Sequence, residues 1–198
     1  MLVGLDVDGI IRNFDKSLKR VYLREYPDHD VKHTNDWALH KFYPIGEDIY
    51  NFAFKDNAVE IFRDAEPYDD ASWFVEQLGK HYEVVCVTSQ PSSEVMMITF
   101  DWLHKHGFDQ SISHYMFKHT EGDFTKGHVR LDVLIDDYVE NLKKAESFGV
   151  MGIGIERSWN KGKWDPLFKG YEEVLDFLAK LKKVKEGKVN IPRAGLFK

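Results

Sequence analysis

The chain has 198 residues, of which 43% are hydrophobic and 14% aromatic, enough apolar material for one domain with a sizeable core and too much for a disordered chain. Its formal net charge of −6 argues against a general nucleic-acid binder, and its apolar stretches are too short for a membrane helix. Because no basic leader precedes the charge at Asp6 and Cys86 is the single cysteine, we expect a cytoplasmic protein without internal disulfides.

Short apolar runs alternate with amphipathic stretches along the chain, and the runs are apolar on both faces. Such strands are typical of a parallel sheet buried between helices, so the sequence predicts an α/β fold with a doubly wound, Rossmann-like sheet. Strands are expected at Leu2–Val7, Glu83–Thr88, His114–Phe117, Asp132–Ile135 and Met151–Ile155. Helices are expected at Asp69–Lys80, Ser93–His106, Tyr138–Phe148 and Tyr171–Leu181.

A long segment interrupts this alternation after the first strand. Residues 13–66 are rich in aromatic and acidic residues and are predicted to form a small, mainly helical cap, which leaves 1–12 and 67–198 as the α/β core. An insertion at this place lies beside the carboxyl ends of the strands, where open α/β sheets bind ligands. A lid over a site is therefore expected, with a decorative insertion as the alternative.

The C-terminal end differs in charge from the rest of the chain. From Ala179 to Lys198 there are seven basic residues and one acid, so this stretch carries +6 and the preceding residues carry −12. A basic tail at 184–198 could contact nucleic acid or a membrane surface. The alternative is the solvated end of a last helix.

The first predicted strand ends in Leu5-Asp6-Val7-Asp8-Gly9, where two carboxylates precede a glycine that can turn the chain. Such a turn brings the Asp6 carboxylate, the Asp8 carbonyl and the Asp8 carboxylate into one small volume. Like charges this close require a cation, and a hard, oxygen-seeking ion such as Mg²⁺ suits them. A plain polar turn, which Asp-Gly commonly forms, is the alternative.

Two further strand ends carry polar residues. Thr88-Ser89 follows the second predicted strand, and small hydroxyls beside exposed backbone N–H groups suit phosphate oxygens, although turns and helix caps also use them. Asp136-Asp137 follows the fourth, with Lys126 ten residues earlier. Adjacent acids after a buried strand are costly unless a cation meets them, although one of the two can serve as a helix N-cap.

Together these segments resemble the four motifs of the haloacid dehalogenase-like phosphohydrolases, in the same order and each at a strand end. By that resemblance Asp6 is the nucleophile that forms an aspartyl-phosphate, and Asp8 is first the general acid and then the base. The resemblance also implies that Thr88 and Lys126 bind the phosphoryl group. The implied ligands of Mg²⁺ are Asp6, Asp8 through its carbonyl, and Asp137 supported by Asp136.

The segment Asp6–Phe14 is similar, more narrowly, to the first motif of the 5′(3′)-deoxyribonucleotidases. That family also has Thr-Ser at the second motif, a similar spacing from the lysine to the acid pair, and a small helical cap after the first strand. The resemblance implies a nucleoside monophosphate substrate, with Ser89 assisting phosphate binding. Residues that are then expected to contact the substrate are Phe14, Trp37, Phe42, Tyr43 and Arg157.

Two positions depart from that family. Gln90 stands where a proline is usual, and Arg12 stands where a small residue is commoner. These departures leave the substrate open, while the phosphatase residues are unaffected. The cap aromatics Trp37, Phe42 and Tyr43 can alternatively form the cap's own core.

The sequence therefore predicts a Mg²⁺-dependent phosphomonoesterase that acts on nucleoside monophosphates. A phosphatase for a sugar phosphate or another small metabolite is the alternative within the same enzyme class. A phosphate-binding module without catalysis is a third hypothesis. In each case we expect a small phosphate ester as the partner, no nucleic-acid polymer, no membrane, and a monomer or homodimer.

Overall fold

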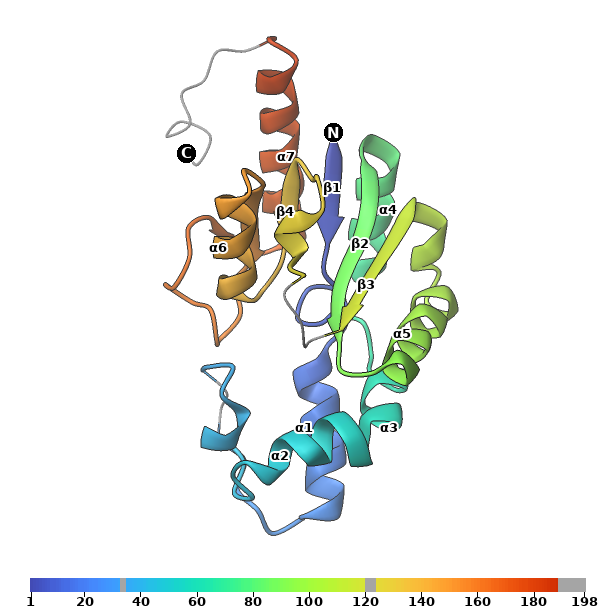
Figure 1. Cartoon of the computed structure of the whole chain (residues 1–198), viewed down its shortest axis with the longest axis vertical. Helices are drawn as coiled ribbons and strands as arrows, with labels where there is room; N and C mark the ends of the chain where they lie inside the picture. Colours follow the sequence, from blue (N-terminus) through green and yellow to red (C-terminus); the bar gives the residue numbers. More distant parts are fainter. Residues whose placement is uncertain (33–34, 120–123, 189–198) are drawn as a thin grey trace.

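The computed structural model describes residues 1–32, 35–119 and 124–188, and a parallel six-stranded sheet lies at its centre. The strand order is β3-β2-β1-β4-β5-β6, which runs outward in both directions from β1. Crossovers to the two sides of β1 therefore place helices on both faces, and the predicted doubly wound α/β fold is confirmed (Figure 1). The strands are β1 (Leu2–Leu5), β2 (Glu83–Gln90), β3 (His114–His119), β4 (Val133–Ile135), β5 (Met151–Ile155) and β6 (Leu167–Phe168).

Helices pack on the two faces of the sheet through separate apolar clusters. On one face lie α4 (Ala71–His81), α5 (Ser93–Lys105) and α7 (Tyr171–Lys185), and on the other lies α6 (Val139–Ser147). Strand β2 contributes to both clusters, because alternate side chains of a strand point to opposite faces. Cys86 belongs to the first cluster and is fully buried, as its position in an apolar strand predicts.

Most element boundaries fall within a few residues of the predicted ones. Strand β2 continues to Gln90 because Ser89 and Gln90 still pair with β3. Helix α4 begins at Ala71 because Asp70 has a left-handed backbone, with φ of 62°, which a helix cannot include. Strand β6 has two residues and no apolar run long enough to predict it.

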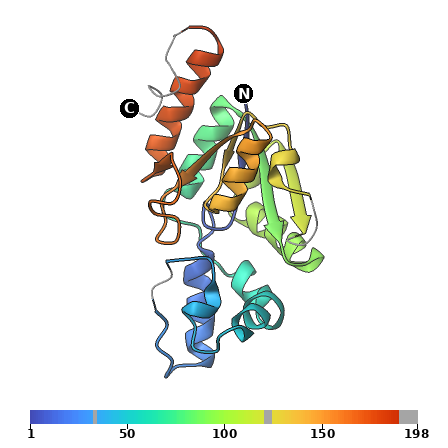
Figure 2. The ribbon, with the colours of Figure 1, turned by 60° about the vertical axis from the view of Figure 1, so that its left-hand side comes forward.

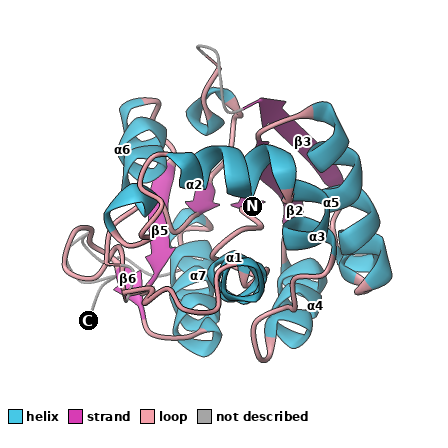
Figure 3. Ribbon diagram, turned by 90° about the horizontal axis from the view of Figure 1, so that it is seen from below, coloured by secondary structure: helices cyan, strands magenta, loops and turns pink. Residues whose placement is uncertain are grey.

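The residues between β1 and α4 form a separate helical layer below the carboxyl ends of the strands (Figures 1 and 2). Its apolar side chains, among them Leu18, Tyr22 and Ile61, form a core of their own, to which α5 adds Val95. Seen from this end, α1 points along the view and α2 lies across the sheet (Figure 3). The elements are α1 (Phe14–Glu25), η1 (Leu39–Lys41), α2 (Asp48–Asn51), the π-helical turn η2 (Phe52–Asp56) and α3 (Ala58–Arg63).

Two chain segments side by side join this cap layer to the sheet. The Asn13 N–H donates to the Glu66 carbonyl at 3.0 Å, and the Tyr68 N–H donates to the Ile11 carbonyl at 3.0 Å. The Asn13 side chain also caps α1, because it accepts the Lys16 N–H at 3.2 Å. The cap therefore begins and ends at one place beside the end of β1.

Helix α7 is the last described element. From residue 189 on, the predicted basic tail at 184–198 lies outside the described residues. Among the described residues, every helix, α7 included, is too short or too polar to span a lipid bilayer.

Candidate active site

The chain turns sharply at the end of β1, directly after Asp6. The Asp6 N–H continues the sheet by donating to the Ile135 carbonyl at 3.0 Å, whereas its side-chain Oδ1 accepts the Val7 N–H at 2.8 Å. Gly9 then reverses the chain with a φ of +76°, in the region that favours glycine. The turn leaves Asp6 nearly buried and places Asp8 at the wall of a cavity.

Gly9 is also required for steric reasons. A Cβ at this position would lie 1.9 Å from Oδ2 and 2.4 Å from Cγ of Asp137. The backbone of the first motif and the carboxylate of the fourth motif therefore approach each other as closely as a residue without a side chain allows.

Lys126 links two of the acids. It comes from the short η4 turn (Lys126–His128), it is buried, and its Nζ lies 2.8 Å from Asp6 Oδ2 and 2.6 Å from Asp136 Oδ2. Burial opposes the charge on the lysine, but the two carboxylates outweigh it and raise the pKa of Lys126 above its ordinary value. Lys126 therefore stays charged beside Asp6.

The two acids after β4 have different partners. Asp136 is saturated: besides Lys126, its oxygens accept the Tyr138 N–H at 2.8 Å and the Asn141 side-chain amide at 3.1 and 3.2 Å. Asp137 accepts one side-chain hydrogen bond, from the Trp159 indole at 2.9 Å. Asp137 therefore keeps acceptor capacity for another ligand, whereas Asp136 serves to hold its neighbours.

Asp6, Asp136 and Asp137 each bring a carboxylate oxygen within 4.8 Å of the others, and all three are buried. Burial, together with the neighbouring carboxylates, raises the pKa of Asp6 to about 7 and raises the pKa of Asp137 well above its ordinary range. A further cation beside Lys126 would favour the ionised form of Asp6 and Asp137. A cluster of hard oxygen donors of this kind fits Mg²⁺.

The end of β2 forms the opposite wall. Thr88 is buried, and Ser89 lies beside it at the cavity surface. Gln90, the next residue, donates to Thr88 Oγ1 at 3.0 Å and so fixes the direction of that hydroxyl. Two small hydroxyls thus face the same cavity as Asp6 and Lys126.

The cavity between the sheet and the cap has a volume of about 400 Å³. The predicted residues Asp6, Asp8, Thr88, Ser89, Lys126 and Asp137 line its sheet side. Two more lysines, Lys118 and Lys144, line it as well, and partial burial and the charges of Lys126 and Lys144 lower the pKa of Lys118. The cap contributes an aromatic wall of Phe14, Trp37, Phe54 and Phe62.

The structure divides the predicted cap aromatics into two groups. Phe14 and Trp37 line the cavity. Tyr43 is buried in the cap core, where it meets Tyr22 edge-on at 4.8 Å, and Phe42 packs against the same core. Phe42 and Tyr43, which follow η1 directly, therefore do not line the cavity.

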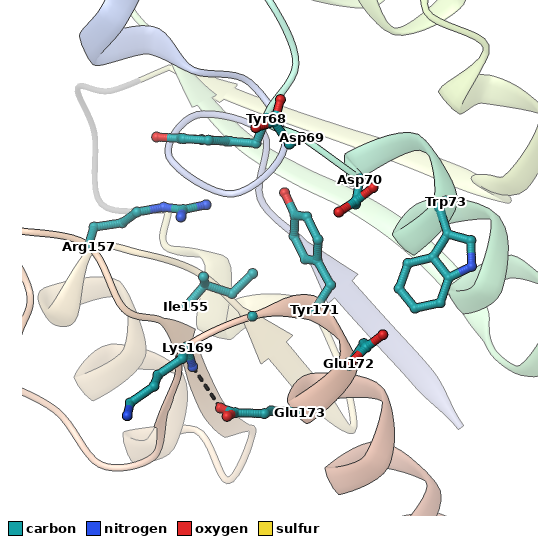
Figure 4. Close-up of a pocket in the computed structure, with 11 residues that line it drawn as sticks. Tyr68, Asp69, Asp70, Trp73, Ile155, Arg157, Lys169, Tyr171, Glu172 and Glu173 are labelled. Carbon is teal, nitrogen blue, oxygen red and sulfur yellow. Dashed lines mark hydrogen bonds between the residues drawn. The ribbon is translucent and has the colours of Figure 1, made fainter.

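Arg157 lies on the far side of the first-motif turn. Its Nε donates to the Gly9 carbonyl at 2.7 Å, and its guanidinium stacks on the Tyr68 ring at 3.9 Å. It borders a second hollow of about 810 Å³, whose wall is mainly acidic and aromatic and includes Tyr171 (Figure 4). Arg157 therefore supports the backbone after Asp8 and does not line the 400 Å³ cavity.

Comparison with protein families identifies the chain. The model of the family described as 5′ nucleotidase, deoxy (pyrimidine), cytosolic type C protein matches residues 1–180. The chain belongs to this nucleotidase family. It is thus a phosphatase of the haloacid dehalogenase-like class, as the four motifs predict. Among curated proteins compared by sequence, none matches it.

Solved structures similar to this nucleotidase-family chain share its fold. A haloacid dehalogenase-like hydrolase from Streptococcus pneumoniae has a TM-score of 0.61 at 13% identity, over 89% of this chain and 97% of its own. CbbY from Rhodobacter sphaeroides, solved with phosphate, has a TM-score of 0.57 at 12% identity, over 87% and 95%. The hydrolase YfnB from Bacillus subtilis, solved with magnesium, has a TM-score of 0.53 at 15% identity, over 78% and 87%.

Several residues that hold the acids beside the cavity were not among the predicted site residues. Trp159 orients the Asp137 side chain, and Asn160 donates to the Asp137 carbonyl at 3.0 Å, while Asn141 binds Asp136. Arg12 and Gln90, noted only as departures from the family, both contact Asp8. The sequence signal for these two was the departure itself, since a long polar residue stands beside a motif where a small residue or a proline is usual.

Proposed function

We propose that this protein is a Mg²⁺-dependent phosphomonoesterase that works through an aspartyl-phosphate and acts on nucleoside monophosphates. The observation that carries the proposal is the placement of Asp6. Its carboxylate lies at the base of a cavity, against Lys126, with hydroxyls on one wall and aromatic rings on another.

The proposed chemistry has two steps. The Asp6 carboxylate attacks phosphorus, the bond from phosphorus to the leaving oxygen breaks, and Asp8 gives that oxygen a proton. Asp8 then takes a proton from water, which attacks the phosphorus, and the bond to Asp6 breaks to restore its carboxylate. The ammonium of Lys126 balances negative charge on the phosphoryl oxygens, and the hydroxyls of Thr88 and Ser89 donate to them.

The metal would be held by the side chains of Asp6 and Asp137 and by the Asp8 carbonyl, with Asp136 fixing the position of Lys126. When bound, Mg²⁺ supplies positive charge that offsets these acids and the charge of the phosphate dianion. The closeness of three buried acids supports this assignment. The magnesium bound to the similar fold of YfnB from Bacillus subtilis is consistent with it.

The aromatic wall supports a nucleotide as the substrate. A nucleobase that stacks on a ring of this wall gains about 1–3 kcal/mol, an interaction that a simple sugar phosphate cannot make. Phe14 and Phe54 stack in parallel with ring centres 5.8 Å apart, and both line the cavity. The description of the matching family as a deoxy (pyrimidine) nucleotidase points the same way.

A substrate panel tests the proposal directly. We expect phosphate release with Mg²⁺ from deoxynucleoside 5′- and 3′-monophosphates, above that from glucose 6-phosphate or glycerol phosphate. Asp6→Asn should abolish release, and a peptide containing Asp6 should carry a phosphoryl group after rapid acid quenching of the wild-type reaction. Asp101→Asn, on the exposed side of α5, is the matched control and should leave turnover unchanged. Sugar phosphates that outrank every nucleotide would contradict the substrate, and a complete lack of Mg²⁺-dependent release would contradict the reaction.

A further inference from the structure

Arg12 is a fully buried arginine where the chain enters the cap. In the described part of the chain, Asp8 is the one carboxylate that it pairs with. Arg12 Nε donates to Asp8 Oδ1 at 2.7 Å, and Arg12 Nη2 donates to Asp8 Oδ2 at 2.8 Å. Because the guanidinium is planar and rigid, this two-pronged contact fixes the plane of the carboxylate as well as its place.

The guanidinium of Arg12 is itself held from other directions. Its Nη1 donates to Thr99 Oγ1 of α5 at 3.1 Å and to the Phe62 carbonyl of α3 at 3.4 Å. Its central carbon lies 4.9 Å from the Phe62 ring and 5.2 Å from the Trp102 ring. Arg12 is therefore fixed between the cap and α5 and cannot follow Asp8 if that side chain rotates.

Gln90 provides the third contact to Asp8. Its Nε2 donates to Asp8 Oδ2 at 3.1 Å, while its Oε1 is buried and has no hydrogen-bond partner among the described residues. The reversed amide would place that oxygen against the carboxylate, so the NH₂ group faces Asp8. A buried acceptor without a partner lowers stability, and packing alone gives no reason to place a glutamine there.

We infer that Arg12 and Gln90 are positioning residues, which together hold the Asp8 carboxylate in one rotamer at the cavity wall. Their three donors occupy three of the roughly four acceptor positions of a carboxylate, which leaves one for a proton that is exchanged with the leaving oxygen or water. The inference rests on the proposed role of Asp8 as general acid and base. Arg12 and Gln90 are also the two positions at which the sequence departs from the deoxyribonucleotidase motifs.

Two substrates with different leaving groups test the inference: a deoxynucleoside monophosphate and p-nitrophenyl phosphate. A nucleoside needs a proton as it leaves, whereas p-nitrophenolate leaves without one, so the first chemical step depends on Asp8 only for the nucleotide. In Arg12→Lys, which leaves the bond from Gln90 to Thr88 in place, we expect the burst-phase rate of nucleoside release to fall at least about tenfold. Gln90→Leu also frees the Thr88 hydroxyl, so its effect on Asp8 is judged from its crystal structure. The burst of p-nitrophenol should change less than about threefold, and KM should change little for both substrates. Arg63→Met, an exposed arginine on α3 that pairs with Asp64, is the control and should change neither rate.

Crystal structures of the same variants provide a readout that does not depend on turnover. We expect Asp8 to occupy another rotamer, or several, in Gln90→Leu and in Arg12→Lys, since the lysine cannot contact both carboxylate oxygens at once. An unchanged Asp8 in both structures, or equal slowing of both substrates, would overturn the inference. A wild-type protein without phosphatase activity would instead refute the proposed function, and the rotamer of Asp8 would still decide whether Arg12 and Gln90 hold it.

Discussion

Replacing Gly9 by alanine should separate metal binding from folding. The new Cβ would lie 1.9 Å from Asp137 Oδ2, so the carboxylate has to retreat by about 1.5 Å to restore an ordinary contact of 3.4 Å. Ligand positions around a metal tolerate displacements of only about 0.2 Å. The atom that must move, Asp137 Oδ2, also accepts the 2.9 Å hydrogen bond from the Trp159 indole, so the retreat changes that contact as well.

The energetic cost of this substitution has two parts. A non-glycine residue at a φ of +76° costs about 1–2 kcal/mol of unfolding free energy. Movement of a proposed metal ligand should in addition weaken Mg²⁺ binding by at least about tenfold and lower kcat/KM by at least the same factor at limiting metal. Calorimetric titration with Mg²⁺, chemical denaturation and phosphate release measure the three quantities separately.

Gly149→Ala is the matched control, because Gly149 has a φ of +78° and nothing within 4 Å of the position of an added Cβ. It should lose the same 1–2 kcal/mol or so of unfolding free energy and keep its affinity for Mg²⁺ and its activity. If Gly9→Ala bound Mg²⁺ and turned over substrate as Gly149→Ala does, the argument from the Asp137 contact would be refuted.

Three further predictions concern the same cavity. Trp159→Phe removes the indole hydrogen bond to Asp137 and should weaken Mg²⁺ binding by about 10–100-fold, measured by titration, with Trp164→Phe as a control outside the cavity. Because burial raises the pKa of Asp6 from 3.8 to about 7, the folded protein keeps a proton that the unfolded chain loses. Stability without metal should therefore fall as the pH rises from about 4 to about 7, and melting curves in EDTA should show a smaller fall for Asp6→Asn. Lys144→Ala should raise KM up to about fivefold at low salt, with kcat unchanged, and an equal effect at high salt would contradict an electrostatic role.

Much of the site is predictable because its residues follow strands with strong apolar patterns. Asp6 comes directly after β1, and the pair Asp136-Asp137 comes directly after β4. The two strands pair in parallel with Leu5 opposite Ile135. Once the sheet order is known, local sequence is enough to bring these acids together, since the carboxyl ends of neighbouring parallel strands share one edge.

The contacts that orient these acids were not predictable in the same way. Trp159 reaches Asp137 across 22 positions and Gln90 reaches Asp8 across 82, and no periodic pattern connects such pairs. The cap aromatics show a related limit. From the sequence, Phe42 and Trp37 are equally good candidates for a substrate contact or for the core of the cap. Their roles differ only through the direction in which the short turns of the cap point them.

The chain enters the cap at Asn13 and leaves it at Glu66, and these two residues are hydrogen-bonded to each other. This arrangement should allow the cap to be exchanged as a unit. Because its two ends are hydrogen-bonded neighbours at 3.0 Å, a different segment whose ends lie equally close could replace it without moving a strand. A chimaera of this kind would keep Asp6, Lys126 and Asp137 and would receive a new wall opposite them. The replacement segment would also have to supply a substitute for Phe62, through which the present cap contacts the guanidinium of Arg12.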